Sequence, residues 1–208
     1  MSEKCTVFAG GEPVSADALD MSFISNSTVY GADKGYYLAK SLGIDCDIVI
    51  GDFDSSPRPE RGDVLVFPKE KDDTDLMLAI KHALKNGAGD IRIYGALGGS
   101  VDHLCGNIQS LAYIVTNGGS ALITGDSDII RLLPAGRYVI SDKKGWSLSL
   151  FSYSERVEGL TIKGTKYTAQ DITLDNSFPL AVSNCITDPK GAELSFSAGL
   201  LLVIQSKR

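Results

Sequence analysis

A chain of 208 residues can form one large domain or two small ones, and its 43% hydrophobic and 22% charged residues are typical of a globular protein with a substantial core. The net charge of −6 argues against a general binder of nucleic acid or of membrane surfaces. The four cysteines lie far apart and lack CxxC spacing, which indicates buried free thiols in a reducing compartment rather than disulfides or zinc ligands.

The N-terminal residues do not form a basic segment followed by an apolar run, so we expect no signal peptide. The longest uncharged stretch, residues 104–125, contains several amide and glycine residues, so we expect a buried helix and strand there and no membrane span. We therefore predict a cytoplasmic protein.

Through the first two-thirds of the chain, short apolar runs alternate with segments of helical periodicity. Strands are predicted at residues 5–9, 28–30, 48–50, 63–67, 91–94 and 121–124, and helices at 34–42, 76–84 and 101–115. Asp73 or Thr74 is expected to cap the second of these helices. The alternation predicts an α/β domain with a mostly parallel, three-layer α/β/α arrangement and right-handed crossovers.

The pattern changes near residues 133–136, where a proline and a glycine follow a leucine pair. Beyond this point, short strands separated by turn residues are predicted at 138–141, 146–152, 160–163, 172–174, 180–183, 193–197 and 200–205. Short strands of this spacing predict a small antiparallel β-sandwich. We therefore expect two domains, residues 1–133 and 134–208.

The stretch CDIVIGDFDS at residues 46–55 carries the strongest chemical signal. A β-branched run typical of a buried parallel strand ends at Gly51, and Asp52 and Asp54 follow on the same side if the chain stays extended. Ligands bind beyond the carboxyl ends of such strands, and two repelling carboxylates there suit a hard divalent cation such as Mg²⁺. The alternative is a solvated turn, since Asp, Gly and Ser are ordinary turn residues.

Three further segments share this placement. Residues 71–75, KDDTD, lie at the start of a predicted helix. Asp72 and Asp75 could share one face at this helix N-terminus, which favours anions, or the segment could be an ordinary helix cap with acidic residues in the first turn. Residues 95–103 form a glycine-rich loop between a strand and a helix, where backbone amides can hold phosphate. Residues 31–35 follow another strand and could be a plain turn. Carboxylates at these strand exits and helix starts should share one edge of a parallel sheet: Asp33, Asp52, Asp54, Asp75 and Asp102.

These motifs together resemble those of the bacterial thiamine diphosphokinases (thiamin pyrophosphokinases). The matching residues run in the family's order: Gly31-Ala32-Asp33-x-Gly35, Gly51-Asp52-Phe53-Asp54-Ser55, Lys71-Asp72-x-Thr74-Asp75, Gly98-Gly99-x-x-Asp102-His103 with Asn107, and Ser183-Asn184. The resemblance implies an N-terminal catalytic domain that binds ATP and Mg²⁺ and a C-terminal β-sandwich for thiamine binding and dimerisation. It also implies a homodimer with active sites at the subunit interface, and transfer of diphosphate from ATP to thiamine with release of AMP.

On this reading, attack of the thiamine hydroxyl on the β-phosphorus of ATP needs positioning and relief of negative charge. Asp52, Asp54 and Asp75 are the expected Mg²⁺ ligands. Either Asp102 or Asp33 is expected to orient or deprotonate the hydroxyl. The expected nucleotide contacts are Lys71, Asp72, Thr74, Gly98, Gly99, His103 and Asn107, and the expected thiamine contacts are Ser183, Asn184 and Tyr167.

The chain departs from the family pattern at two places. Ser100 stands where the family usually has an arginine, so Lys71 or another cation would have to steady the phosphates. The family's GLK-aromatic run is replaced by residues 164–167, GTKY.

Two other functions compete with this one. A phosphatase of the haloacid dehalogenase type also has DxD after an apolar strand, with the first Asp as nucleophile, but it usually has Thr or Val where Ser56 stands. A non-catalytic sensor of thiamine or nucleotide is the second alternative.

Overall fold

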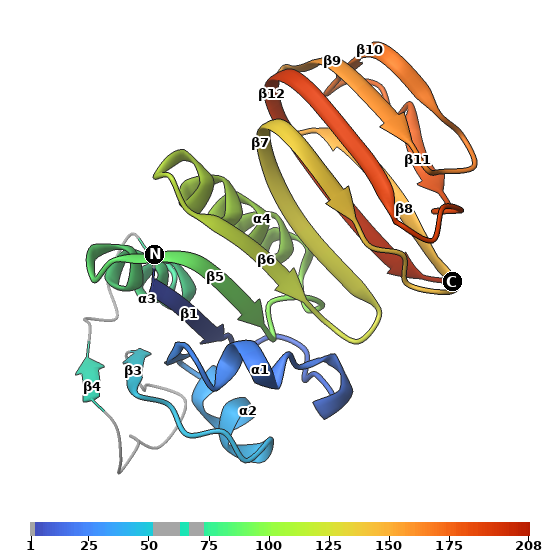
Figure 1. Ribbon diagram of the computed structural model, residues 1–208. Coiled ribbons are helices and arrows are strands. Elements are labelled where there is room, and N and C mark those ends of the chain that lie inside the picture. Colours follow the sequence, from blue (N-terminus) through green and yellow to red (C-terminus); the bar gives the residue numbers. More distant parts are fainter. Residues whose placement is uncertain (1–2, 52–62, 67–72) are drawn as a thin grey trace. The chain divides into compact units, whose positions relative to one another are not determined.

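The computed structural model describes residues 3–51, 63–66 and 73–208, and the chain divides into two compact units, Met1–Asp126 and Ser127–Arg208 (Figure 1). The boundary expected from the sequence, between residues 133 and 134, falls inside strand β7 (Asp128–Ile140). Pro134 suggested a turn, but it lies within β7 and is paired with Leu200 of β12. The register of the β7–β12 pairing shifts just before this pair, between Phe196 and Leu200. Pairing with a distant segment therefore overrides the local turn signal.

The first unit is built on a parallel sheet. In the described residues its strands are β1 (Glu3–Phe8), β2 (Thr28–Ala32), β3 (Ile48–Gly51), β4 (Asp63–Val66), β5 (Ala88–Tyr94) and β6 (Ser120–Thr124). Their order is β6-β5-β1-β2-β3-β4, and each neighbouring pair is parallel. The chain runs outward from β1 to β4 and then returns to the other side of β1, so the strand order reverses between β1 and β5. Ligands in open α/β sheets bind at this reversal point.

Helices cover both faces of this sheet, which confirms the predicted α/β arrangement with its three layers. Helices α3 (Asp75–Lys85) and α4 (Val101–Thr116) bury apolar stripes of helical spacing, and α3 packs on β1, β2, β3 and β5. Helix α2 (Gly35–Ser41) and the short α1 (Met21–Ile24) contact β1. The 3₁₀ turn Ala16–Ala18 and α1 were not predicted, because segments this short show no periodicity.

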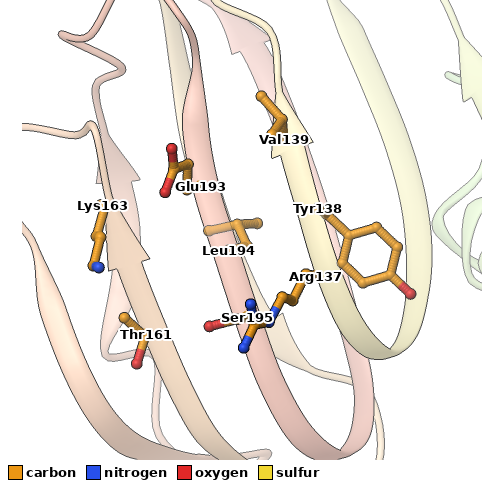
Figure 2. A pocket seen from close by; sticks show the side chains of 8 residues that line it. All are labelled: Arg137, Tyr138, Val139, Thr161, Lys163, Glu193, Leu194 and Ser195. Atoms are coloured by element: carbon orange, nitrogen blue, oxygen red, sulfur yellow. The ribbon is translucent and has the colours of Figure 1, made fainter.

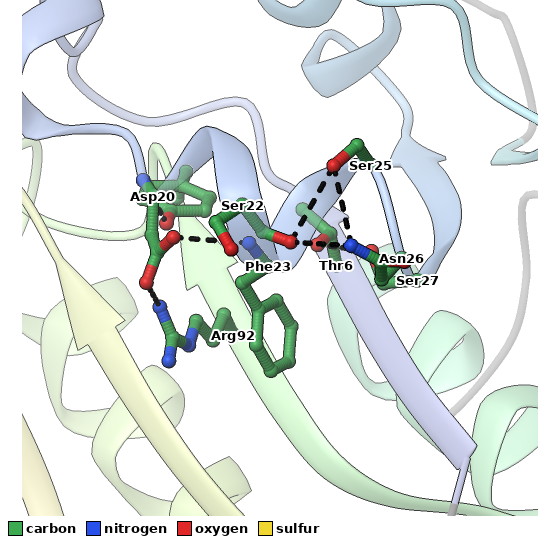
Figure 3. Close-up of polar contacts among 9 residues, drawn as sticks. Thr6, Asp20, Ser22, Phe23, Ser25, Asn26, Ser27 and Arg92 are labelled. Carbon is green, nitrogen blue, oxygen red and sulfur yellow. Dashed lines mark hydrogen bonds and ion pairs between the residues drawn. The ribbon is translucent and has the colours of Figure 1, made fainter.

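Helix α1 is fixed to the sheet by Asp20 (Figure 3). Asp20 caps the helix by accepting a hydrogen bond of 3.0 Å from the Phe23 backbone N–H, and it also forms an ion pair with Arg92 of β5. The Arg92 guanidinium lies 3.9 Å from the centre of the Phe23 ring. These contacts stabilise the ionised carboxylate, because the Phe23 N–H and then the Arg92 side chain hold the pKa of Asp20 below its usual value.

We predict that Asp20→Asn makes the protein less stable than wild type at neutral pH and that this difference becomes smaller in acid. A lowered folded-state pKa contributes stability above the unfolded-chain pKa of about 3.9, and that contribution is lost as the pH falls through the folded-state value. The carboxylate is 44% exposed, so solvent screening limits the neutral-pH difference to about 1 kcal/mol. Urea unfolding of both proteins at about pH 7 and about pH 3 measures it. Asp17→Asn, at an exposed position, is the control. If Asp20→Asn lowered the free energy of unfolding by the same amount at both pH values, the prediction would be wrong.

The second unit is antiparallel. Its strands are β7, β8 (Trp146–Ser152), β9 (Arg156–Lys163), β10 (Ala169–Asp175), β11 (Ala181–Asn184) and β12 (Ala192–Lys207). Strand β12 pairs with β7 along its length, with β9 through its first half and with β8 through its second half. Strands β10 and β11 extend the sheet from β9 and β8. Inward-facing Leu, Ile and Val side chains of β8, β9, β10 and β12 contribute to one buried core, as the predicted β-sandwich requires.

The two strands predicted at 193–197 and 200–205 are one strand, β12, with an irregularity between Phe196 and Leu200. Gly199 has a φ of +94°, and a Cβ there would lie 2.1 Å from the Arg156 carbonyl oxygen. The glycine therefore allows a bulge that bends the strand without ending it.

All four cysteines are free, as predicted, but only Cys5 and Cys46 are buried, whereas Cys105 is exposed. Burial raises the pKa of the Cys5 and Cys46 thiols to about 12. Within the described residues, the structure contains no helix with the length and apolar character needed to cross a membrane.

Candidate active site

A pocket of about 250 Å³ lies in the first unit at the carboxyl end of the parallel sheet. Its walls come from the segments after β1, β2 and β5 and from the first turns of α3 and α4. The pocket therefore lies at the reversal point of the strand order. It brings together seven of the residues predicted from the sequence: Asp33, Thr74, Asp75, Gly98, Gly99, His103 and Asn107.

Glycines form the floor between the ends of β1 and β5. The Gly11 N–H donates to the Gly95 carbonyl over 2.7 Å, and the Glu12 N–H donates to the Leu97 carbonyl over 3.0 Å. A Cβ on Gly11 would lie 2.6 Å from the Gly95 oxygen, so only glycine allows this approach. The part of Gly10 and Gly11 in the pocket was not predicted, although a glycine pair directly after a strand is a signal that the sequence carries.

Asp33 is held at the pocket by its backbone. It has a φ of +47°, a left-handed conformation that aspartate tolerates better than most residues. Its N–H donates to the Ile50 carbonyl over 2.8 Å, and the Cβ position of Gly51 lies 3.3 Å from its Cα. The end of β3 and the turn after β2 are therefore in contact, as expected for neighbouring parallel strands.

The start of α3 supplies Thr74 and Asp75. Of the two expected caps, Thr74 is the one observed: its hydroxyl accepts a hydrogen bond of 3.2 Å from the Met77 N–H. The cap fixes where the helix begins and so places Asp75 in its first turn, in the wall of the pocket. Asp73 is directed elsewhere and pairs with Lys81 at 2.7 Å.

Helix α4 contributes His103 and Asn107, which are four residues apart and share a helix face. Asn107 donates to the Ala96 carbonyl over 2.8 Å and so ties the helix to the glycine-rich loop. The His103 Nδ1 lies 3.1 Å from the Ser100 hydroxyl. Asp102 is exposed and is not part of the pocket wall. A hydrogen bond from the Ser100 side chain, and then one from the His103 backbone N–H, lower the pKa of its carboxyl.

Four of the predicted site residues, Asp52, Asp54, Lys71 and Asp72, lie outside the described residues. Among the described residues, no group of three or more His, Cys, Asp or Glu side chains is close enough to hold a metal ion. The roles assigned to these four residues stay predictions.

The predicted thiamine contacts of the second unit lie together, but Asn184 is turned inward. It is 7% exposed; its Nδ2 donates to the Tyr167 carbonyl over 2.7 Å and its Oδ1 accepts from the Tyr167 N–H over 3.0 Å. Ser183 is exposed with a φ of +58°, and Tyr167 is 63% exposed. Asn184 therefore holds the backbone of the loop from which the Tyr167 ring projects.

We predict that Asn184→Ala destabilises the protein by about 2 kcal/mol, because the Tyr167 N–H loses its acceptor and the Tyr167 carbonyl keeps only the Thr165 hydroxyl as a donor. It should also weaken binding of any ligand that Tyr167 contacts. Chemical unfolding together with Tyr167 proton shifts would measure both effects. Asn176→Ala, at an exposed site, should change neither, and wild-type stability in Asn184→Ala would show that the loop forms without this side chain.

A second hollow, of about 340 Å³, lies on the second unit (Figure 2). Its charged lining residues come from three adjacent strands: Arg137 from β7, Glu193 from β12 and Lys163 from β9. None of the residues predicted as thiamine contacts lines it. No motif in the sequence distinguished these side chains from an ordinary polar strand face.

Comparison with known proteins gives matches to both units. The family described as "Thiamin pyrophosphokinase, catalytic domain" matches residues 21–124, and "Thiamin pyrophosphokinase, vitamin B1 binding domain" matches residues 137–201. A thiamine pyrophosphokinase of Bacillus subtilis (strain 168) is 33% identical over 184 residues, which cover 85% of this chain and 86% of that protein.

Solved structures agree with this match. The crystal structure of the thiamine pyrophosphokinase from Bacillus subtilis has a TM-score of 0.88 and 27% identity, covering 99% of both chains. That of the thiamin pyrophosphokinase from Geobacillus thermodenitrificans has a TM-score of 0.84 and 26% identity, covering 99% of this chain and 98% of the other.

Proposed function

Because this chain belongs to the thiamin pyrophosphokinase family, we propose that the pocket of the first unit holds the triphosphate of ATP during diphosphate transfer. The activity follows from the family: ATP-dependent formation of thiamine diphosphate. One observation supports the assignment of the pocket. The carboxylates of Asp33 and Asp75, the glycine turns after β1 and β5, and the start of α3 all line it at the point where the strand order reverses.

The glycine-rich loop and the start of α4 supply phosphate-binding groups. Gly98 and Gly99 have φ values of +71° and +70°, which side-chain-bearing residues rarely adopt, and the first turn of α4 follows directly. Backbone N–H groups at a helix N-terminus favour anions through hydrogen bonding and the helix dipole. Thr74, His103 and Asn107 add polar groups, and Lys71 and Asp72 are further proposed nucleotide contacts.

We propose Asp52, Asp54 and Asp75 as the residues that hold Mg²⁺. The donor set fits this ion, since carboxylate oxygens are its preferred protein ligands, and Asp75 lines the pocket. Asp52 follows Gly51 in the sequence, and Gly51 lies against Asp33 of the pocket wall. When bound, Mg²⁺ would offset the negative charge of the triphosphate.

The reaction then needs one base. The thiamine hydroxyl oxygen bonds to the β-phosphorus of ATP, the bond from that phosphorus to the oxygen of the α-phosphate breaks, and AMP leaves. Of the two candidate bases for the hydroxyl proton, Asp33 is favoured because it lines the pocket, whereas Asp102 is exposed outside it.

We further propose that the second unit binds thiamine through Ser183 and Tyr167, with Asn184 supporting the loop. The description of the family that matches residues 137–201 supports this assignment. A cytoplasmic homodimer with active sites at the subunit interface, as the family resemblance implies, completes the proposal.

Incubation of the purified protein with ATP, Mg²⁺ and thiamine tests this function. Equal amounts of AMP and thiamine diphosphate are expected, and none without thiamine. Release of phosphate from a phosphoenzyme on Asp52 would indicate the phosphatase alternative, which the family match does not favour. Binding of thiamine or ATP without turnover would indicate the sensor.

A further inference from the structure

Strand β11 contains a bulge in its pairing with β8. The two ends of β11 lie opposite Leu150 and Leu148, and the register shifts between them. Val182 and Ser183 therefore face the single residue Ser149 of β8. Ser183 has a φ of +58°, a left-handed conformation that residues other than glycine rarely adopt. Bulges of this kind often lie next to functional sites, where they redirect a side chain.

Two side chains from separate parts of the second unit bind the backbone of Ser183. The Ser183 N–H donates to the Ser149 hydroxyl over 3.0 Å, and the Ser183 carbonyl accepts from the Arg208 guanidinium over 2.6 Å. Strand β8 pairs with both β11 and β12, which brings the end of β12 close to the bulge (Figure 1). Arg208 directly follows β12, and its own N–H donates to the Gly145 carbonyl over 3.1 Å. The left-handed residue is therefore held at both its N–H and its carbonyl.

The bulge changes which side chains of β11 face solvent. In a regular strand, successive side chains point to opposite faces. Here Val182 and Ser183 are both exposed, and Asn184 is buried, where it binds the backbone of Tyr167. The bulge therefore presents two successive side chains to solvent, while Asn184 keeps its place under the loop that carries Tyr167.

We propose that Ser149 and Arg208 are positioning residues for thiamine binding, because they hold Ser183 in the conformation in which its hydroxyl contacts the substrate. This inference rests on the proposed thiamine contact of Ser183. Serine by itself disfavours the left-handed conformation, so loss of these hydrogen bonds lowers the population that can bind. The apparent affinity for a ligand falls by the same factor as that population. Neither Ser149 nor Arg208 has to touch thiamine.

Nuclear magnetic resonance tests the conformation of Ser183 without a ligand. The N–H and Hα protons of one residue are closer at positive φ than at negative φ, so the nuclear Overhauser effect between them should be strong for Ser183 in wild type. In the Ser149→Ala/Arg208→Ala double variant the left-handed form should fall to about a tenth, because nothing then opposes the preference of serine. Each single variant should lie between, and Arg208→Lys, which keeps a cationic donor, should retain the signal. An unchanged signal in the double variant would overturn the proposal.

Calorimetric titration tests the consequence for the substrate. Thiamine should bind about tenfold more weakly to the Ser149→Ala/Arg208→Ala double variant than to wild type, and Arg208→Lys should bind it normally. Affinity for ATP with Mg²⁺ should not change, because ATP is assigned to the first unit. Unchanged thiamine affinity in the double variant, or equal weakening of ATP and thiamine, would overturn the positioning role.

Ser147→Ala and Lys207→Ala are matched controls that remove the same chemical groups from nearby positions. Ser147 lies two residues before Ser149 in β8, and its hydroxyl donates to the Ser206 carbonyl over 3.2 Å; Lys207 is exposed and directly precedes Arg208. Both variants should keep the strong Ser183 signal and the wild-type affinity for thiamine. Equal weakening of thiamine by Ser147→Ala and Ser149→Ala would indicate a general loss of stability and overturn the proposal.

Failure of the proposed function and failure of this inference give different results. If wild type binds no thiamine but the Ser183 signal responds to the substitutions as expected, the thiamine contact of Ser183 is wrong and the hold on the bulge is right. If thiamine binds and the Ser183 signal does not respond, Ser183 keeps its conformation without Ser149 and Arg208, and the inference is wrong.

Discussion

Replacing Asp75 by asparagine should lower the rate of thiamine diphosphate formation by roughly 10³-fold, because several kcal/mol of charge stabilisation on the transferring phosphate depend on an intact metal site. The substitution keeps the shape of the side chain and the Thr74 cap, whose hydroxyl accepts from Met77 and not from Asp75. The free energy of unfolding should therefore stay within about 0.5 kcal/mol of wild type. Initial rates of AMP release over a range of Mg²⁺ concentrations measure the effect.

Asp73→Asn is a matched control for Asp75→Asn. Asp73 lies two residues earlier at the same helix start, but its carboxylate pairs with Lys81 at 2.7 Å and does not line the pocket. Asp73→Asn should lower the free energy of unfolding by at most about 1 kcal/mol, the value of an exposed ion pair, and should form thiamine diphosphate at the wild-type rate. Near-normal turnover in a folded Asp75→Asn variant would show that Asp75 is not a metal ligand. The proposal that this pocket binds ATP would then depend on Asp33 and the glycine loops alone.

The layered architecture could be predicted because its signals are local. Helices α3 and α4 have apolar stripes of helical spacing, and β8 was predicted with the bounds that the structure shows, Trp146–Ser152. The errors occur where a distant segment decides the structure. Pro134 and Gly199 mark turns by local chemistry, yet both lie in long strands held by the β7–β12 pairing.

The pocket was predictable in part for the same geometrical reason. Parallel strands bring their carboxyl ends to one edge, so Asp33 and Asp75 could be expected together. Asp102 was included by the same argument, but on α4 it is next to His103, about 100° around the helix axis. His103 and Asn107 face the pocket, so Asp102 faces away from it. Helical phase, applied to the sequence, would have separated these residues.

Motif matching could not show how Asn184 is used. An asparagine next to a serine in a strand of the β-sandwich can present its amide to a ligand or to the backbone. The structure directs it to the backbone of Tyr167, seventeen residues earlier in the chain. That choice depends on the pairing of β11 with β8 and on the loop before β10, neither of which is encoded locally.

Gly35→Ala should destabilise the first unit by roughly 3 kcal/mol, the upper end for overpacking a buried site, and should abolish activity by displacing the turn that carries Asp33. A Cβ on Gly35 would lie 1.9 Å from the Phe8 carbonyl oxygen and 2.8 Å from the Ala9 nitrogen, both of them backbone atoms of β1 and its exit. Backbone in the centre of a parallel sheet cannot move as a side-chain tip can. Helix α2 would have to move away from β1, and the Asp33 turn directly before the helix would move with it.

Gly106→Ala is the matched control, since it makes the same chemical change inside helix α4. Apart from its chain neighbours and the backbone of its own helix, a Cβ at Gly106 would have no heavy atom within 4 Å, so the exchange should stabilise the protein by about 1 kcal/mol through helix propensity. Thermal and urea unfolding of the two variants should therefore differ from wild type in opposite directions. If Gly35→Ala were as stable and active as wild type, α2 would not be in close contact with β1, and the contact that holds Asp33 at the pocket would have to come from β3 alone.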